Sequence, residues 1–208
     1  MAVIEATASI AIWILPRTLP EVVQQWTQRL WVVLVAVWVV GAFKTRQTAR
    51  RQTISSRFWQ MGFVLLGMWL LFGWDTGVTW MDGAAFPMTA NVAIAGLALT
   101  LVGVAFAIWA RVTLGTNWSG VITVKEGHTL VRRGPYSIVR HPIYTGILTA
   151  VTGTALTHGT VRAILALPVV AFGFWLKTLT EERFMAAQFG EEYTRYQREV
   201  RALVPFLF

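Results

Sequence analysis

RRGPYSIVRHPIYTG, residues 132–146, marks where this chain passes from a polar segment into an apolar one. Its first half carries cations and turn-forming residues, and its second half leads into an apolar run that continues to residue 157. Pro142 suits the first turn of a helix, because the N–H group that proline lacks has no partner there. We therefore expect a helix to begin at Pro142, with titratable side chains gathered at its entrance.

The composition is that of a membrane protein. Of the 208 residues, 55% are hydrophobic and 13% are charged, whereas about a quarter of an ordinary soluble domain is charged. The 11 tryptophans fit anchoring at a membrane–water interface, since indole joins an apolar body to one N–H donor. Cysteine is absent, so disulfides and cysteine-ligated metals are excluded, and we expect no metal site.

Five apolar segments approach the roughly 17 to 25 residues that cross a bilayer. They are residues 26–43, 58–74, 91–110, 143–157 and 163–179. Residues 2–15 are a candidate sixth span, a half-span or an interfacial helix, because Pro16 and Pro20 follow them. The sequence thus predicts an all-α, polytopic membrane bundle. Residues 1–110 would form the scaffold and the substrate entrance, and residues 111–208 the catalytic region.

Charge is distributed unevenly between the connections. One connection holds five cations, namely Lys44, Arg46, Arg50, Arg51 and Arg57. The next holds Asp75 and Asp82 but no lysine or arginine. The positive-inside rule makes the first connection cytoplasmic, and counting forward places residues 111–141 and the C-terminus on the same side. Because the cations lie between apolar segments, the net charge of +8 favours anionic lipids over nucleic acid as partners.

The last two apolar segments form a predicted helical hairpin that turns near His158-Gly159. After Lys177 charged and aromatic residues alternate at helical spacing. This pattern predicts an amphipathic helix at the cytoplasmic surface, with a break near Gly190.

Arg140 and His141 stand at the predicted entrance of a membrane helix. The free N–H groups of a helix start attract anions, and the guanidinium of Arg140 offers a planar fork of donors for a carboxylate or phosphate. Alternatively, the pair only reaches towards lipid headgroups. Gly146 lets a ligand or another helix approach closely, and the Gly134-Pro135-Tyr136 turn aims Tyr136 in a defined direction.

Glu181 and Glu182 directly follow the last apolar segment. We expect one to point into the bundle, where a carboxylate could pair with Arg140 and His141 or bind an ammonium group or ribose hydroxyls. The alternative is a solvated helix start.

These residues belong to an ordered series of motifs between residues 111 and 208. The series is Leu114-Gly115 with Trp118, Gly127-His128-x-Leu130-Val131, Gly134-Pro135-Tyr136, Arg140-His141-Pro142-x-Tyr144-x-Gly146, Glu181-Glu182, Phe189-Gly190-x-Glu192-Tyr193-x-x-Tyr196 and Val204-Pro205. In this series the chain resembles the isoprenylcysteine carboxyl methyltransferase and phospholipid methyltransferase group of integral membrane enzymes. The N-terminal half carries no such motif.

The resemblance implies a methyl transfer from S-adenosylmethionine to a lipophilic acceptor, either a carboxylate, an amine or a thiol. It implies a cofactor pocket between the last two spans and the C-terminal helix. The matching positions are His128, Leu130, Val131, Gly134, Pro135, Tyr136, His141, Tyr144, Gly146, Glu181 and Glu182. It also implies catalytic roles for Arg140, His141 and Glu182, with Arg140 anchoring an anionic acceptor. We expect a multi-pass protein of a prokaryotic inner membrane, with its site facing the cytoplasm.

Two other functions stay open. Membrane sterol reductases share a similar C-terminal block and hold NADPH, but their His-Pro is typically followed by Asn-Tyr, whereas this chain has Ile143 before Tyr144. A non-catalytic protein of the same fold is the second alternative. The sequence leaves the acceptor and the oligomeric state undetermined.

Overall fold

A computed structural model describes residues 18–42, 48–51, 54–73, 76–115, 123–125 and 130–204, without the side chains of 48–51, 54–58 and 123–125. The candidate sixth span at 2–15 lies outside the described residues, as does His128 of the expected cofactor set. The same holds for Asp75, Trp118, Gly127 and Pro205.

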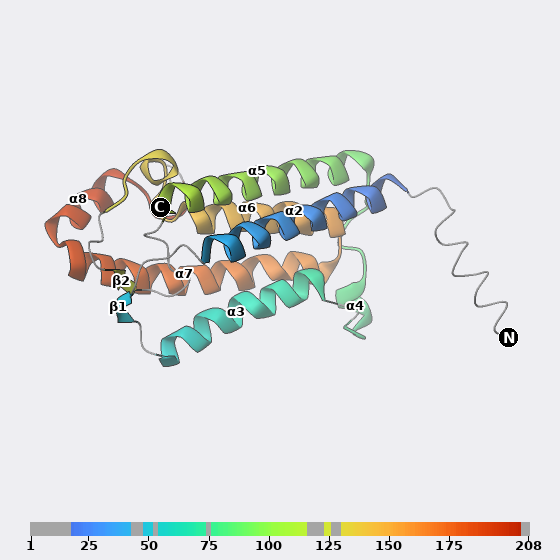
Figure 1. Ribbon diagram of the computed structural model, residues 1–208. Helices are drawn as coiled ribbons and strands as arrows, with labels where there is room; N and C mark the ends of the chain where they lie inside the picture. Colours follow the sequence, from blue (N-terminus) through green and yellow to red (C-terminus); the bar gives the residue numbers. More distant parts are fainter. Residues whose placement is uncertain are drawn as a thin grey trace.

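Long helices dominate the described part of the chain and run side by side (Figure 1). They are α2 (Leu19–Ala42), α3 (Ile54–Phe72), α5 (Ala90–Leu114), α6 (Pro142–His158) and α7 (Val161–Phe189). Each contains or overlaps one predicted span, so the helical nature of these segments is confirmed. By length and composition, α5 and α7 can each cross a membrane. The count of five spans stays a prediction.

Helices α5 and α6 pack closely because glycine faces glycine. An added Cβ at Gly146 would lie 2.6 Å from the backbone nitrogen of Ala107 and 2.7 Å from the carbonyl oxygen of Gly103. One at Gly103 would lie 2.5 Å from the carbonyl oxygen of Gly146. Any side chain at these two positions would push the helices apart. Small residues have the opposite effect in membrane bundles, because they let helices approach closely. The start of α6 is thereby fixed against α5.

Helix α2 is joined to this pair by a buried polar chain. The indole Nε1 of Trp31 donates to Thr154 Oγ1 at 2.9 Å, and Thr154 lies 3.4 Å from the hydroxyl of Thr100 on α5. Helix α3 packs on α7, where Gln60 Nε2 donates to Thr180 Oγ1 at 2.8 Å. Apolar side chains such as Val32, Leu65 and Val102 are exposed on the outer surface, as expected where helices face lipid.

The predicted hairpin between the last two segments is present. Gly159 takes a left-handed conformation (φ 65°) at the end of α6, and α7 begins two residues later. Helix α7 then continues without interruption past Lys177 and through Glu181-Glu182 to Phe189. The amphipathic segment therefore starts as the end of α7. The expected break occurs at Gly190 (φ 54°), after which α8 (Glu191–Glu199) follows.

Four smaller elements complete the described part of the chain. Helix α4 (Thr79–Asp82) lies between α3 and α5, and η2 (Gly134–Ser137) is a 3-10 turn just before α6. Strands β1 (Thr48–Arg51) and β2 (Thr123–Lys125) form an antiparallel ribbon that pairs Arg51 with Thr123 and Thr48 with Lys125. The all-α prediction missed this ribbon, because a short pairing between segments so far apart in sequence leaves no periodic pattern.

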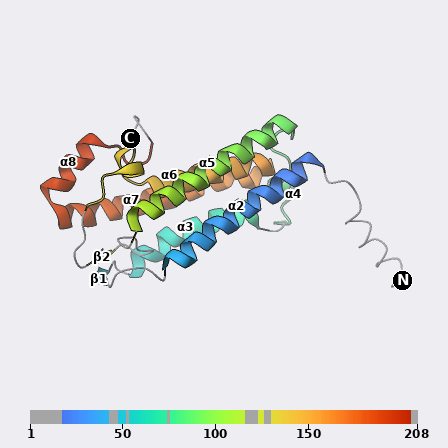
Figure 2. The ribbon, with the colours of Figure 1, turned by 45° about the horizontal axis from the view of Figure 1, so that its top comes forward.

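Alternating helix directions place β1 and β2, the described strands of the two basic connections, at the same end of the bundle. Helices α2, α5 and α7 end there, and α3 and α6 begin there (Figure 1). The turned view in Figure 2 shows η2 and α8 gathered at this end as well. The expected boundary at residue 110 falls inside α5, and the division into a scaffold and a catalytic region stays a prediction.

Candidate active site

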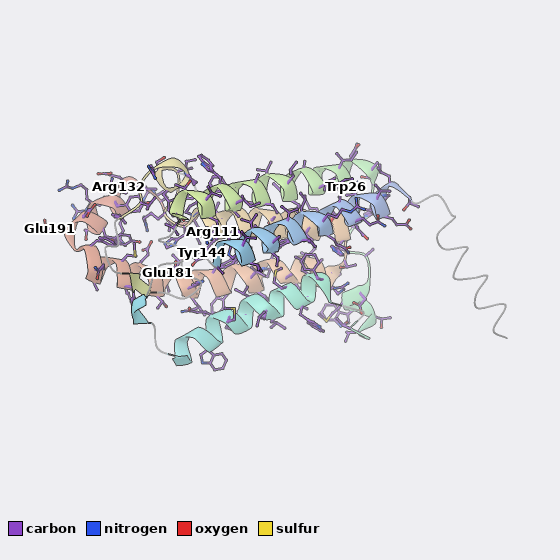
Figure 3. The ribbon with its side chains drawn as sticks, viewed as in Figure 1. Trp26, Arg111, Arg132, Tyr144, Glu181 and Glu191 are labelled. Atoms are coloured by element: carbon purple, nitrogen blue, oxygen red, sulfur yellow. The ribbon has the colours of Figure 1, made fainter. Side chains whose placement is uncertain are left out.

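The candidate site lies at the end of the bundle where α6 begins. Three pieces of chain meet there, namely the entrance of α6, the last third of α7, and α8 with the segment after it. Figure 3 shows Tyr144 and Glu181 near this end, far from Trp26 at the other end of α2. The structure thus brings together residues about forty positions apart in sequence, as the predicted hairpin requires.

His141 lies between the two glutamates. Its Nδ1 is 3.4 Å from Glu181 Oε2, and its Nε2 is 3.2 Å from Glu182 Oε1. An ionised carboxylate only accepts hydrogen bonds, so both ring nitrogens must carry a proton to satisfy this arrangement. Burial opposes that charge, but hydrogen bonds to Glu181 and Glu182 outweigh it and raise the pKa of His141. The imidazolium therefore bridges two carboxylates.

Aromatic rings continue from His141 into the bundle. Tyr144 stacks on His141 with ring centroids 5.6 Å apart, and on Phe174 at 4.7 Å. The Tyr144 hydroxyl donates to Glu181, and Lys177 Nζ lies 5.2 Å from the centre of the Tyr144 ring. The site therefore combines carboxylates with π faces on the buried side.

Arg140 points away from the aromatic stack, towards α7 and α8. Its Nε donates to Glu182 Oε1 at 2.9 Å, and its Nη2 donates to the same oxygen at 2.5 Å. Its Nη1 donates to the carbonyl oxygens of Gln197 and Val200. The predicted pairing of Arg140 with this carboxylate is thus present, whereas its role as an acceptor anchor stays a prediction.

The segment after α8 is tied to the entrance of α6 by its backbone. The N–H groups of Arg140 and His141 donate to the carbonyls of Arg201 (2.7 Å) and Ala202 (3.0 Å). Thr145 Oγ1 donates to the carbonyl of Leu203 at 2.6 Å. The end of the described chain therefore lies against the entrance of α6, next to the site.

The Gly134-Pro135-Tyr136 turn is present as η2. Gly134 has a φ of 61°, which suits glycine, and Tyr136 is buried. The backbone oxygen of Tyr136 accepts from the Tyr196 hydroxyl on α8. Burial, and then the nearby charge of Glu181, raises the pKa of Tyr136. Tyr136 therefore belongs to the same neighbourhood as His141 and Glu181.

The other expected cofactor residues are less closely placed. Leu130 and Val131 are partly buried just before η2. Gly146 faces α5, so the structure uses it for helix packing, the alternative that the sequence left open. Cofactor contacts for these three residues stay predictions.

The structure adds residues that the sequence did not single out. Gln197 Nε2 donates to Glu182 Oε2 at 3.0 Å. Thr178 lies one turn before Glu181 and Glu182 on α7 and is only 5% exposed, yet its hydroxyl has no hydrogen-bond partner among the described residues. Threonines elsewhere in the bundle, such as Thr149 and Thr180, donate to the carbonyl four residues earlier. Helical spacing from Glu181 and Glu182 could have indicated Thr178.

Comparisons with known proteins bear on this site. Residues 92–192 match the phospholipid methyltransferase family model. A probable protein-S-isoprenylcysteine O-methyltransferase of Oryza sativa subsp. indica is 31% identical over 119 residues, covering 56% of this chain and 62% of that protein. Protein-S-isoprenylcysteine O-methyltransferase B of Arabidopsis thaliana is 31% identical over 115 residues, covering 54% of this chain and 58% of that protein.

A bacterial relative reaches further along the chain. The cobalt-zinc-cadmium resistance protein CzcN of Cupriavidus metallidurans is 34% identical over 146 residues, covering 66% of this chain and 57% of that protein. The solved structure of a eukaryotic intramembrane Ras methyltransferase, an isoprenylcysteine carboxyl methyltransferase, covers 76% of this chain and 55% of that one at 20% identity and a TM-score of 0.47. That likeness is too weak to place any residue.

The matched family model and the two plant relatives are all named for methyl transfer. They confirm the family resemblance that the motifs carry, to the isoprenylcysteine carboxyl methyltransferase and phospholipid methyltransferase group. The chain spans about three fifths of the length of these two plant isoprenylcysteine methyltransferases. The matched segment extends from the start of α5 to the start of α8 and so contains His141, Glu181 and Glu182.

Proposed function

We propose that this chain transfers a methyl group from S-adenosylmethionine to a lipophilic acceptor at the cytoplasmic face of a membrane. The observation that carries the proposal is the arrangement of two carboxylates, one histidine and an aromatic stack at one end of an apolar bundle. The names of the relatives support the reaction class.

The residues present fit the cationic methyl donor. S-adenosylmethionine carries a sulfonium and an ammonium group, and its adenine can stack. Carboxylates such as Glu181 bind an ammonium group, and aromatic faces such as Tyr144 and Phe174 attract cations and stack with flat rings. The buried Thr178 hydroxyl, without a partner among the described residues, offers a further hydrogen bond to a ligand. A buried polar group without a partner is costly, so its presence favours a ligand there.

Glu181 is the carboxylate more available to a ligand. Among the described residues it contacts the Tyr144 hydroxyl and His141 Nδ1, one at each oxygen. Since a carboxylate has about four lone-pair sites, each oxygen can accept a further bond. Glu182 receives bonds from Arg140, His141 and Gln197. We assign Glu181 to the donor, with His141 and Glu182 holding it in place.

The bound donor would supply an electrophilic methyl group on its sulfonium. The methyl's bond to sulfur breaks as its bond to the acceptor forms, which leaves a neutral thioether and a methylated acceptor. Positive charge disperses in this displacement, so alignment and exclusion of water contribute more than proton transfer. A carboxylate acceptor needs no base, whereas an amine needs one, for which His141 would first have to lose its proton.

The acceptor is expected to arrive from the membrane. The outer faces of α2, α3 and α5 expose apolar side chains towards lipid, and the site lies at the end of the bundle where the basic connections gather. The positive-inside rule makes that end cytoplasmic. The relatives act on isoprenylcysteine by name, and a lipid-linked carboxylate is therefore the first acceptor to test. We place the protein in a prokaryotic inner membrane as a multi-pass protein.

A methyl-transfer assay tests this function. The detergent-purified chain would be incubated with S-adenosylmethionine carrying a labelled methyl group and with lipid extracts or a farnesylcysteine carboxylate, and products would be identified by mass spectrometry. We expect label in a lipophilic product, and calorimetric binding of S-adenosylmethionine but not of NADPH. Binding of NADPH alone would favour the reductase alternative and contradict the proposal.

A further inference from the structure

Arg140 has little capacity left for a ligand. A guanidinium has five N–H donors, and four hydrogen bonds are formed from them, two to Glu182 and two to backbone carbonyls. Its side chain is only 10% exposed. An acceptor carboxylate would have to displace Glu182 or these carbonyls to form a two-point contact with Arg140.

The carbonyls that Arg140 contacts lie at the C-terminal end of α8. Gln197 is in its last turn, and Val200 directly follows it. The last carbonyls of a helix have no partner inside the helix and carry partial negative charge. Arg140 satisfies two such groups, and it thereby joins α8 to the entrance of α6.

The same guanidinium orients Glu182. Arg140 contacts Glu182 Oε1 through two nitrogens, and Gln197 of α8 holds Oε2 at 3.0 Å. The oxygen that Arg140 holds is the one that faces His141 Nε2 at 3.2 Å. The contacts run from α8 through Arg140 and Glu182 to His141, and from its Nδ1 to Glu181.

We propose that Arg140 is a positioning residue, which acts through Glu182 to hold His141 and the donor-binding carboxylate Glu181 in place, rather than the anchor of the acceptor. This inference rests on the proposed function, since it concerns the same site. In this proposal α8 contributes to donor binding through Arg140 and Glu182, although α8 itself need not touch the donor.

A double-mutant cycle separates the two roles. Arg140→Met keeps the apolar stem and removes the guanidinium, and Glu182→Gln keeps the shape of its partner. We expect Arg140→Met to weaken S-adenosylmethionine binding about tenfold or more while the KM for the acceptor changes less than about twofold. The double variant should bind the donor no more weakly than Glu182→Gln alone, because residues that act through one another are not additive.

Arg132→Met is the matched control. Arg132 also pairs with a carboxylate of α8, Glu199, and lies over the ring of Tyr196. Within the described part of the chain, Arg132 forms its ion pair and its ring contact with α8 and not with Glu182 or His141. We expect its donor affinity to stay within about twofold of the wild type, a change well below 1.4 kcal/mol, the equivalent of tenfold. An equal loss in both arginine variants would show that any tie to α8 matters, and would overturn the specific role of Arg140.

Two results would contradict the positioning role directly. One is a raised acceptor KM with unchanged donor affinity in Arg140→Met, which would assign the arginine to the acceptor. The other is a double variant whose donor losses multiply. If the wild type bound no donor, the proposed function would fail. The positioning role would then be decided by thermal unfolding of the wild type, Arg140→Met, Glu182→Gln and the double variant. Losses in unfolding midpoint that do not add would support it, and additive losses would refute it.

Discussion

The two ends of the helical bundle both carry an arginine–carboxylate pair, but they are built differently. At the end opposite the site, Arg162 Nε lies 3.1 Å from Asp82 Oδ1, and Arg162 Nη1 donates to the carbonyl of Leu70 at 2.9 Å. The other oxygen of Asp82 accepts from the backbone and the hydroxyl of Thr76. One guanidinium thus pairs with one carboxylate. Arg162 also binds a carbonyl near the end of α3, and Asp82 also binds the turn at Thr76.

At the site end two carboxylates share one histidine, and one of them, Glu182, also pairs with an arginine. Glu182 is held by Arg140 and Gln197, whereas Glu181 keeps capacity for a further partner. Aromatic rings lie beside these carboxylates. So does the hydroxyl of Thr178, which has no hydrogen-bond partner among the described residues. An ion pair that ties elements together thus differs from a binding site in the hydrogen-bonding capacity that remains for a further partner. Substitutions at the two ends should therefore affect different properties.

The largest effect is expected at the paired glutamates. The double variant Glu181→Gln/Glu182→Gln removes both negative charges near the cationic donor while keeping the side-chain shapes. We expect donor affinity to fall by about a hundredfold or more, since contacts between close charges are worth about 2–5 kcal/mol or more. Calorimetry on detergent-purified protein would measure the loss, with size-exclusion chromatography as the folding control. Unchanged affinity would remove the carboxylates from the site.

The opposite end should show the converse behaviour. Arg162→Met leaves Asp82 without its guanidinium and releases the carbonyl of Leu70. Breaking a buried pair costs about 3–5 kcal/mol, and less when the partners are partly exposed, as these are. We expect a fall of about 2 kcal/mol in unfolding free energy, measured by thermal unfolding, with donor affinity unchanged in protein that remains folded. A selective loss of donor binding would break the distinction between the two ends.

The stability of the fold should change with pH because His141 loses its proton as the pH rises. Burial lowers its pKa, but hydrogen bonds to Glu181 and Glu182 raise it by more. The stability contributed by the imidazolium is therefore complete below the ordinary histidine pKa of about 6.5 and is lost as the pH rises through the raised value. We expect the unfolding midpoint to fall as the pH rises above about 6.5, and to fall less in His141→Gln. Parallel curves for the two proteins would contradict a charged His141.

The smallest effect is expected at Thr178. Thr178→Val keeps the shape and removes the hydroxyl, and one neutral hydrogen bond contributes about 0.5–1.5 kcal/mol. Donor affinity should fall by about two- to tenfold. Thr180→Val, on the same helix, removes a hydroxyl that is already bonded to Leu176 and Gln60, and it should leave donor affinity unchanged. In the protein without donor, Thr178→Val should be neutral or stabilising. A loss of stability with unchanged affinity would instead show a packing role for Thr178.

Much of this fold follows from local sequence patterns. The apolar runs predict the five helices, Pro142 predicts the start of α6, and the glycines at 159 and 190 predict the hairpin turn and the break before α8. The pairing of His141 with Glu181 and Glu182 follows from the short hairpin that brings their segments together. These features depend on periodicity, on proline and glycine geometry and on chain length, which a sequence displays directly.

Other features depend on contacts that no local pattern encodes. The bonds from Arg140 to the carbonyls of Gln197 and Val200 need the position of α8, and the β1–β2 ribbon needs two distant connections to meet. Gly146 was a candidate for either ligand approach or helix packing, and only the position of α5 shows that it packs. The sequence therefore predicts which residues gather, and the structure adds how each one's bonding capacity is used.

Photochemical cross-linking would show where the methyl donor binds, whereas calorimetry measures only how tightly it binds. Wild-type protein would be irradiated with S-adenosylmethionine labelled in its methyl group, digested, and mapped by mass spectrometry, with excess S-adenosylhomocysteine as the competitor. We expect competed label on peptides that carry Tyr136, Tyr144 or the end of α7. Competed label confined to peptides from the opposite end, around Asp82 and Arg162, would contradict this expectation.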